Sequence, residues 1–324
     1  MTLRIFINGF GRIGRTITRI ILTEHADIDI VGINDIAPLD SCAYLFGYDS
    51  VFGPFPGGVT GRDGALHAAG RKIAMTHAED ISALDLAGVD IVLECTGKAQ
   101  TQMIAERGLI AGAERILISG PSPAAEDTIV LGANHDILAD QKILSNASCT
   151  TNALAPLLRL LDEAAGVQSG HMTTVHCYTG SQPTVDAPRG DLVRSRAAAL
   201  SMVPTTTSAG RLIGTVLPHL AGRIEARAIR VPTASVSAID LTVQTRDPIT
   251  AETLNGMIQS ADPTLFGYTD LPLVSTDLRG RPESLIVAGR ETSVSLGGVL
   301  RIFGWYDNEW GFSARMIDMA RRMR

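Results

Sequence analysis

A glycine-rich stretch near the N-terminus decides the fold of the first half of the chain: Arg4-Ile5-Phe6-Ile7-Asn8-Gly9-Phe10-Gly11-Arg12-Ile13-Gly14-Arg15. Residues 4–8 form a short apolar run typical of a buried strand, and residues 12–23 carry isoleucines at helical spacing. The glycines between them form a GxGxxG pattern. Gly9 allows a tight turn, Gly11 lets a pyrophosphate approach the backbone, and Gly14 lets helix and strand pack closely. The pattern therefore predicts a dinucleotide-binding turn that leads into a helix N-terminus.

An acidic residue follows at the position that this turn requires. A second strand-like run, residues 28–33, leads to Asn34 and Asp35, about 20 residues beyond the glycines. A carboxylate there accepts hydrogen bonds from a ribose diol and repels a 2′-phosphate. We therefore expect NAD rather than NADP. Taken alone, the glycine pattern is also compatible with a purely structural turn, because glycine is common in this chain.

The rest of the chain divides into two regions that differ in their predicted pattern of strands and helices. Strand-like runs at residues 90–94 and 115–119 flank a helix-like segment at residues 101–112, which favours a doubly wound parallel sheet. Beyond residue 150 the strands become longer, at 171–176, 226–231, 236–244 and 296–305, which favours an α+β domain with a mixed or antiparallel sheet. We expect a Rossmann-type domain over residues 1–148, a catalytic domain over 149–312, and an amphipathic C-terminal helix over 313–324.

Composition excludes several classes of protein. The net charge is −6 and shows no basic stripe, so we expect no nucleic-acid partner. No apolar run approaches the roughly 18 residues of a membrane span, and no signal peptide is apparent. The four cysteines, at 42, 95, 149 and 177, lack metal-type spacing, so we expect no metal site. Cysteines without a disulfide framework favour a reducing cytoplasm.

Cys149 and His176 are candidates for chemistry. Small polar residues at 145–148 are good helix caps before an apolar run, so Cys149 should lie in the first turn of a helix, where the dipole favours the thiolate. We expect Pro156 to kink that helix. His176 lies at the end of a strand-like run. A lone cysteine or histidine is more often a buried structural residue, and spacing does not show that the two meet.

These residues together resemble the phosphorylating glyceraldehyde-3-phosphate dehydrogenase family. The resemblance is carried by residues 8–15, 147–152, 173–176, 230–233 and 305–309, in this order, and it extends over essentially the whole chain. It implies an NAD domain, a catalytic domain, a C-terminal helix packed back on the first domain, and a homotetramer. It also implies a small phosphorylated aldehyde and inorganic phosphate as substrates.

The resemblance further implies a role for individual residues. Cys149 would attack the aldehyde carbon and His176 would remove the proton. The cofactor would be bound by Asn8, Gly9, Phe10, Gly11, Arg12, Ile13, Asp35, Thr96, Ser119, Pro188 and Asn308. The substrate phosphate would be bound by Thr179, Ser181, Arg194 and Arg230, and the attacking phosphate by Ser148, Thr150, Thr207 and the neighbouring Ser208.

Three positions depart from the family pattern. Ser208 stands where the family usually has glycine, which puts the attacking-phosphate site in question. Phe312 stands where tyrosine is common. Residues 76–80 lack the arginine often found near the adenine.

Two other functions compete with this interpretation. Erythrose-4-phosphate dehydrogenase shares the cysteine and histidine but hydrolyses its thioester, and residues 271–275 and 308–312 lean toward it. Thr179 and Ser181 keep the phosphate-binding pattern of the glyceraldehyde enzymes instead. The third possibility is a non-catalytic, NAD-binding regulatory protein, since a fold alone does not fix a function. The presence of both Cys149 and His176 argues against it.

Overall fold

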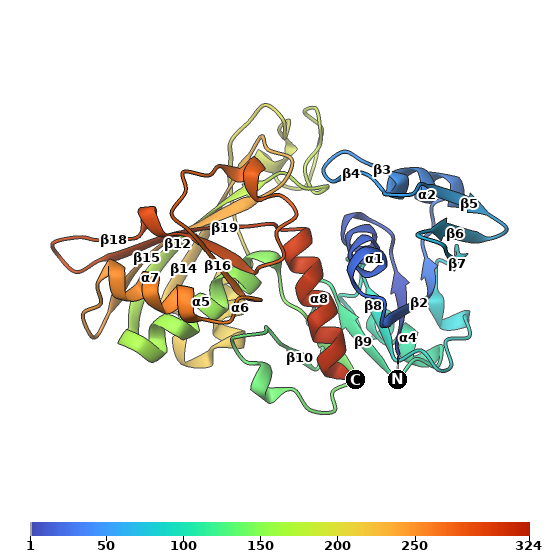
Figure 1. The fold of residues 1–324 in the computed structure, drawn as a ribbon, viewed down its shortest axis with the longest axis horizontal. Coiled ribbons are helices and arrows are strands. Elements are labelled where there is room, and N and C mark those ends of the chain that lie inside the picture. Colours follow the sequence, from blue (N-terminus) through green and yellow to red (C-terminus); the bar gives the residue numbers. More distant parts are fainter. Residues whose placement is uncertain (1) are drawn as a thin grey trace. The chain divides into compact units, whose positions relative to one another are not determined.

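The computed structural model describes residues 2–324, and these form two compact units (Figure 1). The first unit contains the chain up to Ile129, together with Asp136–Ala147 and Ser313–Arg324. The second contains Val130–His135 and Ser148–Phe312. Compared with the expected division after residue 148, residues 130–135 and Ser148 group with the second unit. Arg159 supplies a physical reason, because its Nη1 donates to the carbonyl oxygen of Ala133 at 2.6 Å.

The first unit is built on a nine-stranded sheet in the order β10-β11-β9-β8-β1-β2-β7-β6-β5. Its strands are β1 (Leu3–Asn8), β2 (Ile28–Asn34), β5 (Val59–Arg62), β6 (Ala65–Ala68), β7 (Arg71–Thr76), β8 (Ile91–Glu94), β9 (Arg115–Ile118), β10 (Asp127–Thr128) and β11 (Ile143–Ser145). All pairs from β10 to β7 are parallel, whereas the β7–β6 and β6–β5 pairs are antiparallel. The predicted Rossmann-type sheet is confirmed.

Helices and short elements complete this unit. Helix α1 (Arg12–Glu24) follows the glycine turn and buries Ile17, Ile20 and Ile21, as its isoleucine spacing predicted. Helix α2 (Leu39–Gly47) precedes a small hairpin of β3 (Tyr48–Asp49) and β4 (Gly53–Pro54).

The helix expected over residues 101–112 is interrupted. It consists of two single turns, α3 (Gln102–Ala105) and α4 (Arg107–Ile110). Gly108 lies in the second turn, and a Cβ there would come within 2.9 Å of Val92 Cγ2. The close approach to the sheet thus favours glycine at this position, although glycine is a poor helix former.

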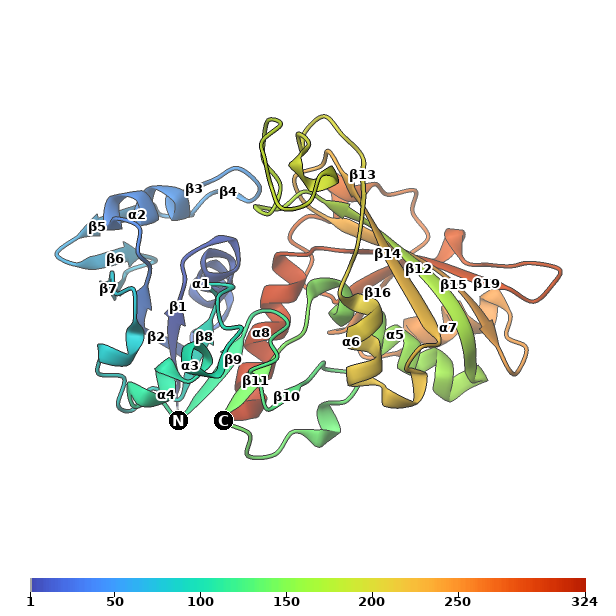
Figure 2. The same ribbon diagram turned by 180° about the vertical axis from the view of Figure 1, so that it is seen from behind.

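The second unit is built on an eight-stranded mixed sheet (Figure 2). Its strands are β12 (Val167–Cys177), β13 (Val203–Thr205), β14 (Ile224–Val231), β15 (Ser237–Thr245), β16 (Phe266–Thr269), β17 (Leu285–Ala288), β18 (Ser293–Val294) and β19 (Leu300–Tyr306). The central strand β12 pairs parallel with β14 and antiparallel with β15. The predicted α+β domain with a mixed sheet is confirmed. Three helices pack with this sheet: α5 (Cys149–Ala165), α6 (Ala209–Val216) and α7 (Ala251–Ser260).

Helix α5 begins at the candidate nucleophile. Ser148 is its N-cap, and the Ser148 Oγ accepts a hydrogen bond from the backbone N–H of Thr151 at 3.1 Å. The helix continues past Pro156, which was expected to kink it, for a total of 17 residues. Pro156 is buried, and its ring lies where a Cβ on Gly132 would come within 3.2 Å of it.

The C-terminal helix α8 (Trp310–Met323) has most of its residues in the first unit. Arg321 Nη2 donates to Asp27 Oδ1 at 2.9 Å within that unit. Across residues 2–324, no helix combines the length and the apolar character that crossing a bilayer demands.

Gly14 and Gly11 of the turn differ in the space available for a side chain, so substitutions at the two positions should differ in their effect on stability. A Cβ on Gly14 would lie 2.1 Å from the carbonyl oxygen of Gly9, whereas a Cβ on Gly11 would meet no atom within 4 Å. We expect Gly14→Ser to cost roughly 1–3 kcal/mol or more of stability, because backbone atoms must move. Gly11→Ser should leave the thermal midpoint unchanged, since serine is a good N-cap. Equal melting midpoints for the two variants, measured by circular dichroism, would refute this packing argument.

Candidate active site and cofactor pocket

The cysteine and the histidine meet in the second unit. Cys149 is the first residue of α5, and His176 is the second-last residue of β12. The Sγ of Cys149 lies 3.6 Å from the Nε2 of His176, which is hydrogen-bonding distance for sulfur. Cys149 keeps partial exposure while His176 is only 6% exposed. A nucleophile within reach of a base that is held in place is the geometry of covalent catalysis.

Strand register brings an arginine to the same histidine. His176 of β12 is paired with Arg230 of β14. The Nη1 of Arg230 donates to the carbonyl oxygen of Cys177 at 2.8 Å and lies 2.7 Å from His176 Nδ1. A cation is therefore fixed beside the base by the backbone pairing of the two strands.

The same contacts bear on the tautomer of His176. Its Nδ1 lies 2.7 Å from the carbonyl oxygen of Cys177 and 2.7 Å from Nη1 of Arg230. The guanidinium only donates, so the two contacts favour opposite tautomers. We place the proton on Nδ1, because two acceptor atoms at that distance would repel, whereas a carbonyl oxygen has lone pairs for both donors. The Nε2 lone pair then faces the Cys149 thiol.

Burial favours the neutral form of both groups of this pair. The pKa of the Cys149 thiol is raised, chiefly by burial, although hydrogen bonds with Thr150 and the charge of Arg230 act to lower it. The pKa of His176 is lowered to about 4, first by burial and then by Arg230. The helix position alone favoured a thiolate, but burial outweighs it. A neutral imidazole is nevertheless the form that can accept the thiol proton.

A buried tyrosine, Tyr306, packs beside Cys149 and His176. The sequence did not identify it as a site residue. Tyr306 is 1% exposed, and its hydroxyl lies 2.9 Å from Thr150 Oγ1 and 2.8 Å from Thr174 Oγ1. Its ring meets the His176 ring edge-on, with centroids 6.0 Å apart. The alternating burial of β19 points Tyr306 inward, so strict alternation from Leu300 was the signal that could have found it.

The hydroxyls expected to bind the attacking phosphate already have protein partners. The Oγ of Ser148 caps α5 and lies 2.7 Å from the Thr151 hydroxyl, while the Thr150 hydroxyl faces Tyr306. Thr207 Oγ1 accepts from the N–H of Ala209 at the start of α6. Ser208 has φ −74°, ordinary helical backbone, so the glycine usual in the family is not required there by conformation.

The residues expected to bind the substrate phosphate lie in three groups. The hydroxyls of Thr179 and Ser181 lie 3.0 Å apart. Arg194 instead reaches the segment before α6, where its Nε donates to Thr205 Oγ1 at 2.7 Å and its Nη2 to Thr206 Oγ1 at 3.0 Å. Arg194 is therefore held beside Thr207 and Ser208 by this segment, while Arg230 lies with the catalytic pair.

Asn308 has a fixed amide orientation. Its Oδ1 accepts from the Cys177 thiol at 3.1 Å and from the Ser237 hydroxyl at 3.3 Å. This leaves the Nδ2 group as a donor for another partner. Pro188, also expected at the cofactor, lies exposed in the loop that follows β12.

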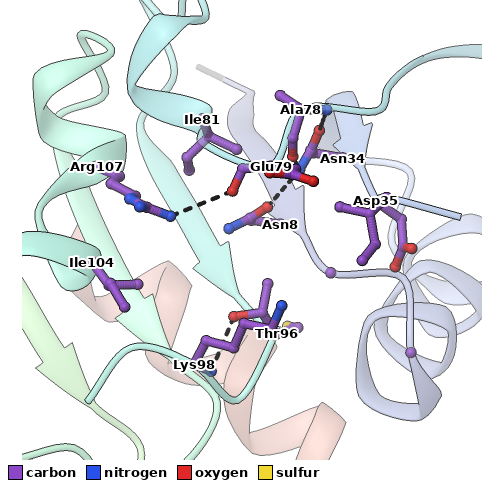
Figure 3. Close-up of a pocket in the computed structure, with 14 residues that line it drawn as sticks. Asn8, Asn34, Asp35, Ala78, Glu79, Ile81, Thr96, Lys98, Ile104 and Arg107 are labelled. Atoms are coloured by element: carbon purple, nitrogen blue, oxygen red, sulfur yellow. Dashed lines mark hydrogen bonds between the residues drawn. The ribbon is translucent and has the colours of Figure 1, made fainter. Parts of the chain in front are cut away.

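The first unit contains the candidate cofactor pocket (Figure 3). Five expected cofactor residues line it, namely Asn8, Gly9, Gly11, Asp35 and Thr96. The other lining residues are Asn34, Ile36, Ala78, Glu79, Ile81, Cys95, Lys98, Ile104 and Arg107. The shape suits a dinucleotide, because Gly9 has φ +96° and the space above Gly11 is open to an approaching phosphate.

Polar side chains form one row at the ends of four adjacent strands, and two of them, Asn8 and Asn34, line this pocket. Asn8 Nδ2 donates to Glu94 at 2.5 Å, Asn34 Nδ2 donates to Asn8 Oδ1 at 2.9 Å, and Thr76 Oγ1 lies 2.8 Å from Asn34 Oδ1. These four residues are register partners across β8, β1, β2 and β7. We call them the polar row. Of its members, the sequence marked only Asn8 as a site residue.

Asp35 is anchored at the edge of the pocket. Its Oδ2 accepts from the N–H of Phe10 at 2.7 Å and its Oδ1 from the N–H of Ala37 at 2.8 Å. The carboxylate is thereby tied to the glycine turn, in the position from which it can meet a ribose.

Other expected cofactor residues lie away from this pocket's lining. Phe10 is 2% exposed and stacks on Phe46, and Arg12 pairs with Asp49. Ile13 follows in α1, and the N–H of Ser119 donates to the Glu94 carbonyl at 2.9 Å. Residues 76–80 supply no arginine, but Arg107 of α4 lines the pocket, a contribution that local sequence did not reveal.

A doubly wound dinucleotide-binding unit together with a cysteine–histidine pair defines a class: NAD-dependent dehydrogenases that act through an enzyme thiol. Residues 3–102 match the family model described as glyceraldehyde 3-phosphate dehydrogenase, NAD binding domain, and residues 148–308 match the C-terminal domain of that family. The chain belongs to the glyceraldehyde-3-phosphate dehydrogenase family, and NAD is its cofactor.

Similar proteins span the chain from end to end. A glyceraldehyde-3-phosphate dehydrogenase of Cereibacter sphaeroides is 45% identical, with 100% of this chain and 99% of the relative covered. Proteins of the same name from Xanthobacter flavus and Zymomonas mobilis are each 44% identical, with 100% of this chain and 99% of each relative covered.

The lowered pKa of His176 predicts a pH-dependent stability. Between pH 6.5 and about 4 the unfolded chain binds a proton that folded His176 does not, so stability falls as the pH falls through this window. The loss should be about 3 kcal/mol at the lower end. We expect His176→Gln to remove this part of the pH dependence in denaturant unfolding. His219→Gln, an exposed control, should retain it. Parallel pH curves for wild type and His176→Gln would contradict the assignment.

Proposed function

We propose that this chain catalyses the NAD-dependent oxidative phosphorylation of glyceraldehyde 3-phosphate to 1,3-bisphosphoglycerate. The observation that carries the proposal is the 3.6 Å contact between Cys149 Sγ and His176 Nε2, with Arg230 beside it, in a chain of this family. A thiol, a base and a fixed cation are the parts needed to acylate an enzyme from a phosphorylated aldehyde.

Cys149 and His176 divide the work of the first step. The Sγ of Cys149 forms a bond to the aldehyde carbon while Nε2 accepts the thiol proton, which gives a thiohemiacetal and an imidazolium. The oxyanion is stabilised by that imidazolium and by the backbone N–H of Cys149 at the start of α5. NAD, when bound, supplies the acceptor for the hydride that leaves this carbon. His176 keeps the proton that it took from the thiol while the hydride leaves and Cys149 becomes a thioester.

The second step returns the thiol. An oxygen of inorganic phosphate attacks the thioester carbon, the carbon–sulfur bond breaks, and the acyl phosphate leaves. The departing sulfur takes its proton back from His176 Nε2, and the proton of the attacking phosphate is released to solvent. Tyr306 and Thr174 support this exchange by fixing Thr150 and the His176 ring.

The anion-binding roles remain proposals built on these contacts. Arg230 is proposed to serve both phosphates, because a guanidinium presents several N–H donors. Thr179, Ser181 and Arg194 are proposed for the substrate phosphate. The attacking phosphate is assigned to Ser148, Thr150, Thr207 and Ser208. The hydrogen bonds of Arg194 to residues 205 and 206 support a role for it near Thr207 as well.

The cofactor roles are proposed in the same way. Asn8, Gly9, Gly11, Asp35 and Thr96 line the pocket, and Asp35 favours NAD over NADP by charge. The main-chain groups of Phe10, Arg12 and Ile13 would face the pyrophosphate at the N-terminus of α1. Asn308 would donate its Nδ2 to the nicotinamide carboxamide. Ser119 and Pro188 are kept as further cofactor residues.

The wider setting of the protein is also proposed. We infer a homotetramer and a cytoplasmic location, which rest on the family resemblance and on four cysteines that are all free of disulfides. A hydrolytic erythrose-4-phosphate dehydrogenase is the second candidate function, because it would use the same thiol and imidazole. A non-catalytic NAD-binding regulatory protein is disfavoured, because the thiol and imidazole are paired.

The nucleophile gives a direct test. Cys149→Ser should abolish nearly all dehydrogenase turnover, because a hydroxyl is far less readily ionised than a thiol, while NAD affinity stays unchanged. Turnover is measured by NADH absorbance and affinity by titration calorimetry. The matched control is Cys42→Ser, since Cys42 is buried in α2. Turnover by Cys149→Ser within a few-fold of the control would exclude Cys149 as the nucleophile.

Dependence on phosphate separates the two candidate reactions. With glyceraldehyde 3-phosphate and NAD alone, we expect NADH production to stop after about one turnover per site, because the thioester persists without an acceptor. Added phosphate or arsenate should restore steady turnover. Continued turnover at full rate without either anion would identify the hydrolytic reaction, and erythrose 4-phosphate should then be the better substrate in parallel assays.

A further inference from the structure

Arg107 lies in the cofactor pocket without a role in the reaction described above. It is the first residue of α4, and its guanidinium is held from two sides. Its Nη2 lies 3.2 Å from Asp80 Oδ2, and its Nη1 reaches the carbonyl oxygen of Glu79 at 3.4 Å. Its side chain remains 26% exposed. Because the guanidinium is already held in place and remains partly exposed, it can bind a ligand with little further loss of conformational freedom.

The surroundings of Arg107 suit a flat heterocycle. Ile81 and Ile104 line the same part of the pocket and pack with the apolar core of the unit. Figure 3 shows Arg107 and Ile104 on the side of the pocket opposite Asp35. Apolar walls with a planar cation bind aromatic rings, because the guanidinium stacks on a π face and donates N–H groups to ring nitrogens.

The anchored groups fix which part of NAD reaches Arg107. The glycine turn receives the pyrophosphate and Asp35 receives the ribose of the adenosine half. The base attached to that ribose then extends across the pocket, past the ends of β1 and β8, toward Ile81 and Ile104. Arg107 is the single arginine among the described residues that line this pocket, and residues 76–80 contain none.

We propose that Arg107 binds the adenine of NAD, with its guanidinium positioned by Asp80 and by the Glu79 carbonyl. The proposal rests on NAD as the cofactor of the proposed function. It assigns adenine recognition to α4. This helix is separate in sequence from the glycine turn and from the loop after β7. The interruption of the helix at residue 106 starts the second turn at Arg107, from where the side chain enters the pocket.

The test is direct ligand binding to the full-length protein by titration calorimetry. Arg107→Ala should raise the Kd of NAD and of ADP-ribose by a similar factor, about 5- to 30-fold for a desolvated cation–π contact. Nicotinamide mononucleotide, which lacks adenine, should bind wild type and variant alike. Arg62→Ala removes the same charge from an exposed position on β5 and should leave all three affinities unchanged.

Two further variants separate the contribution of the Arg107 guanidinium from that of the loop geometry around it. Asp80→Asn keeps the guanidinium and the cap of the following turn, so NAD affinity should stay within about 3-fold of wild type. Arg107→Lys keeps the charge but loses the planar donor group, and its Kd should lie between those of wild type and Arg107→Ala.

The outcomes distinguish the two proposals. If wild type binds no NAD, the proposed function fails. If wild type binds NAD and Arg107→Ala or Arg107→Lys matches it, the role of the Arg107 guanidinium is overturned. An equal loss of affinity for nicotinamide mononucleotide in Arg107→Ala would also overturn it, because the effect would then not depend on adenine.

Discussion

A single row of hydrogen-bonded side chains fixes the ligand-binding edge of the first unit. Glu94, Asn8, Asn34 and Thr76 stand at matching register positions on four adjacent parallel strands, and each is bonded to the next. Three of them are almost fully buried, so an unpaired member would carry a large desolvation cost. A slip of one residue in any strand would break the row, so the row secures the register on which the pocket floor and the glycine turn depend.

The second unit uses register in the same way, but for chemistry. The pairing of β12 with β14 places His176 opposite Arg230, and the carbonyl of Cys177 accepts hydrogen bonds from both. Burial lowers the pKa of His176 and raises that of Cys149, which favours the neutral form of each group.

Positions that depart from the family pattern have local explanations. Ser208 adopts ordinary helical backbone, so its Cβ imposes no strain at the start of α6. The arginine absent from residues 76–80 has a counterpart in Arg107, which approaches the same pocket from α4 and is tied to Asp80 and Glu79. Residues 79, 80 and 107 are thus distant in sequence but adjacent in space.

The sequence by itself determined the elements and the chemistry-bearing residues. The glycine turn, the helix that begins at Cys149 and the class of each sheet follow from backbone freedom, capping and periodicity, which act over a few residues. Only the tertiary structure decided that Cys149 meets His176, that Tyr306 bridges Thr150 and Thr174, and that Arg107 enters the pocket. These contacts join residues far apart in the chain, so they depend on strand register and packing. Local sequence patterns carry no information about either.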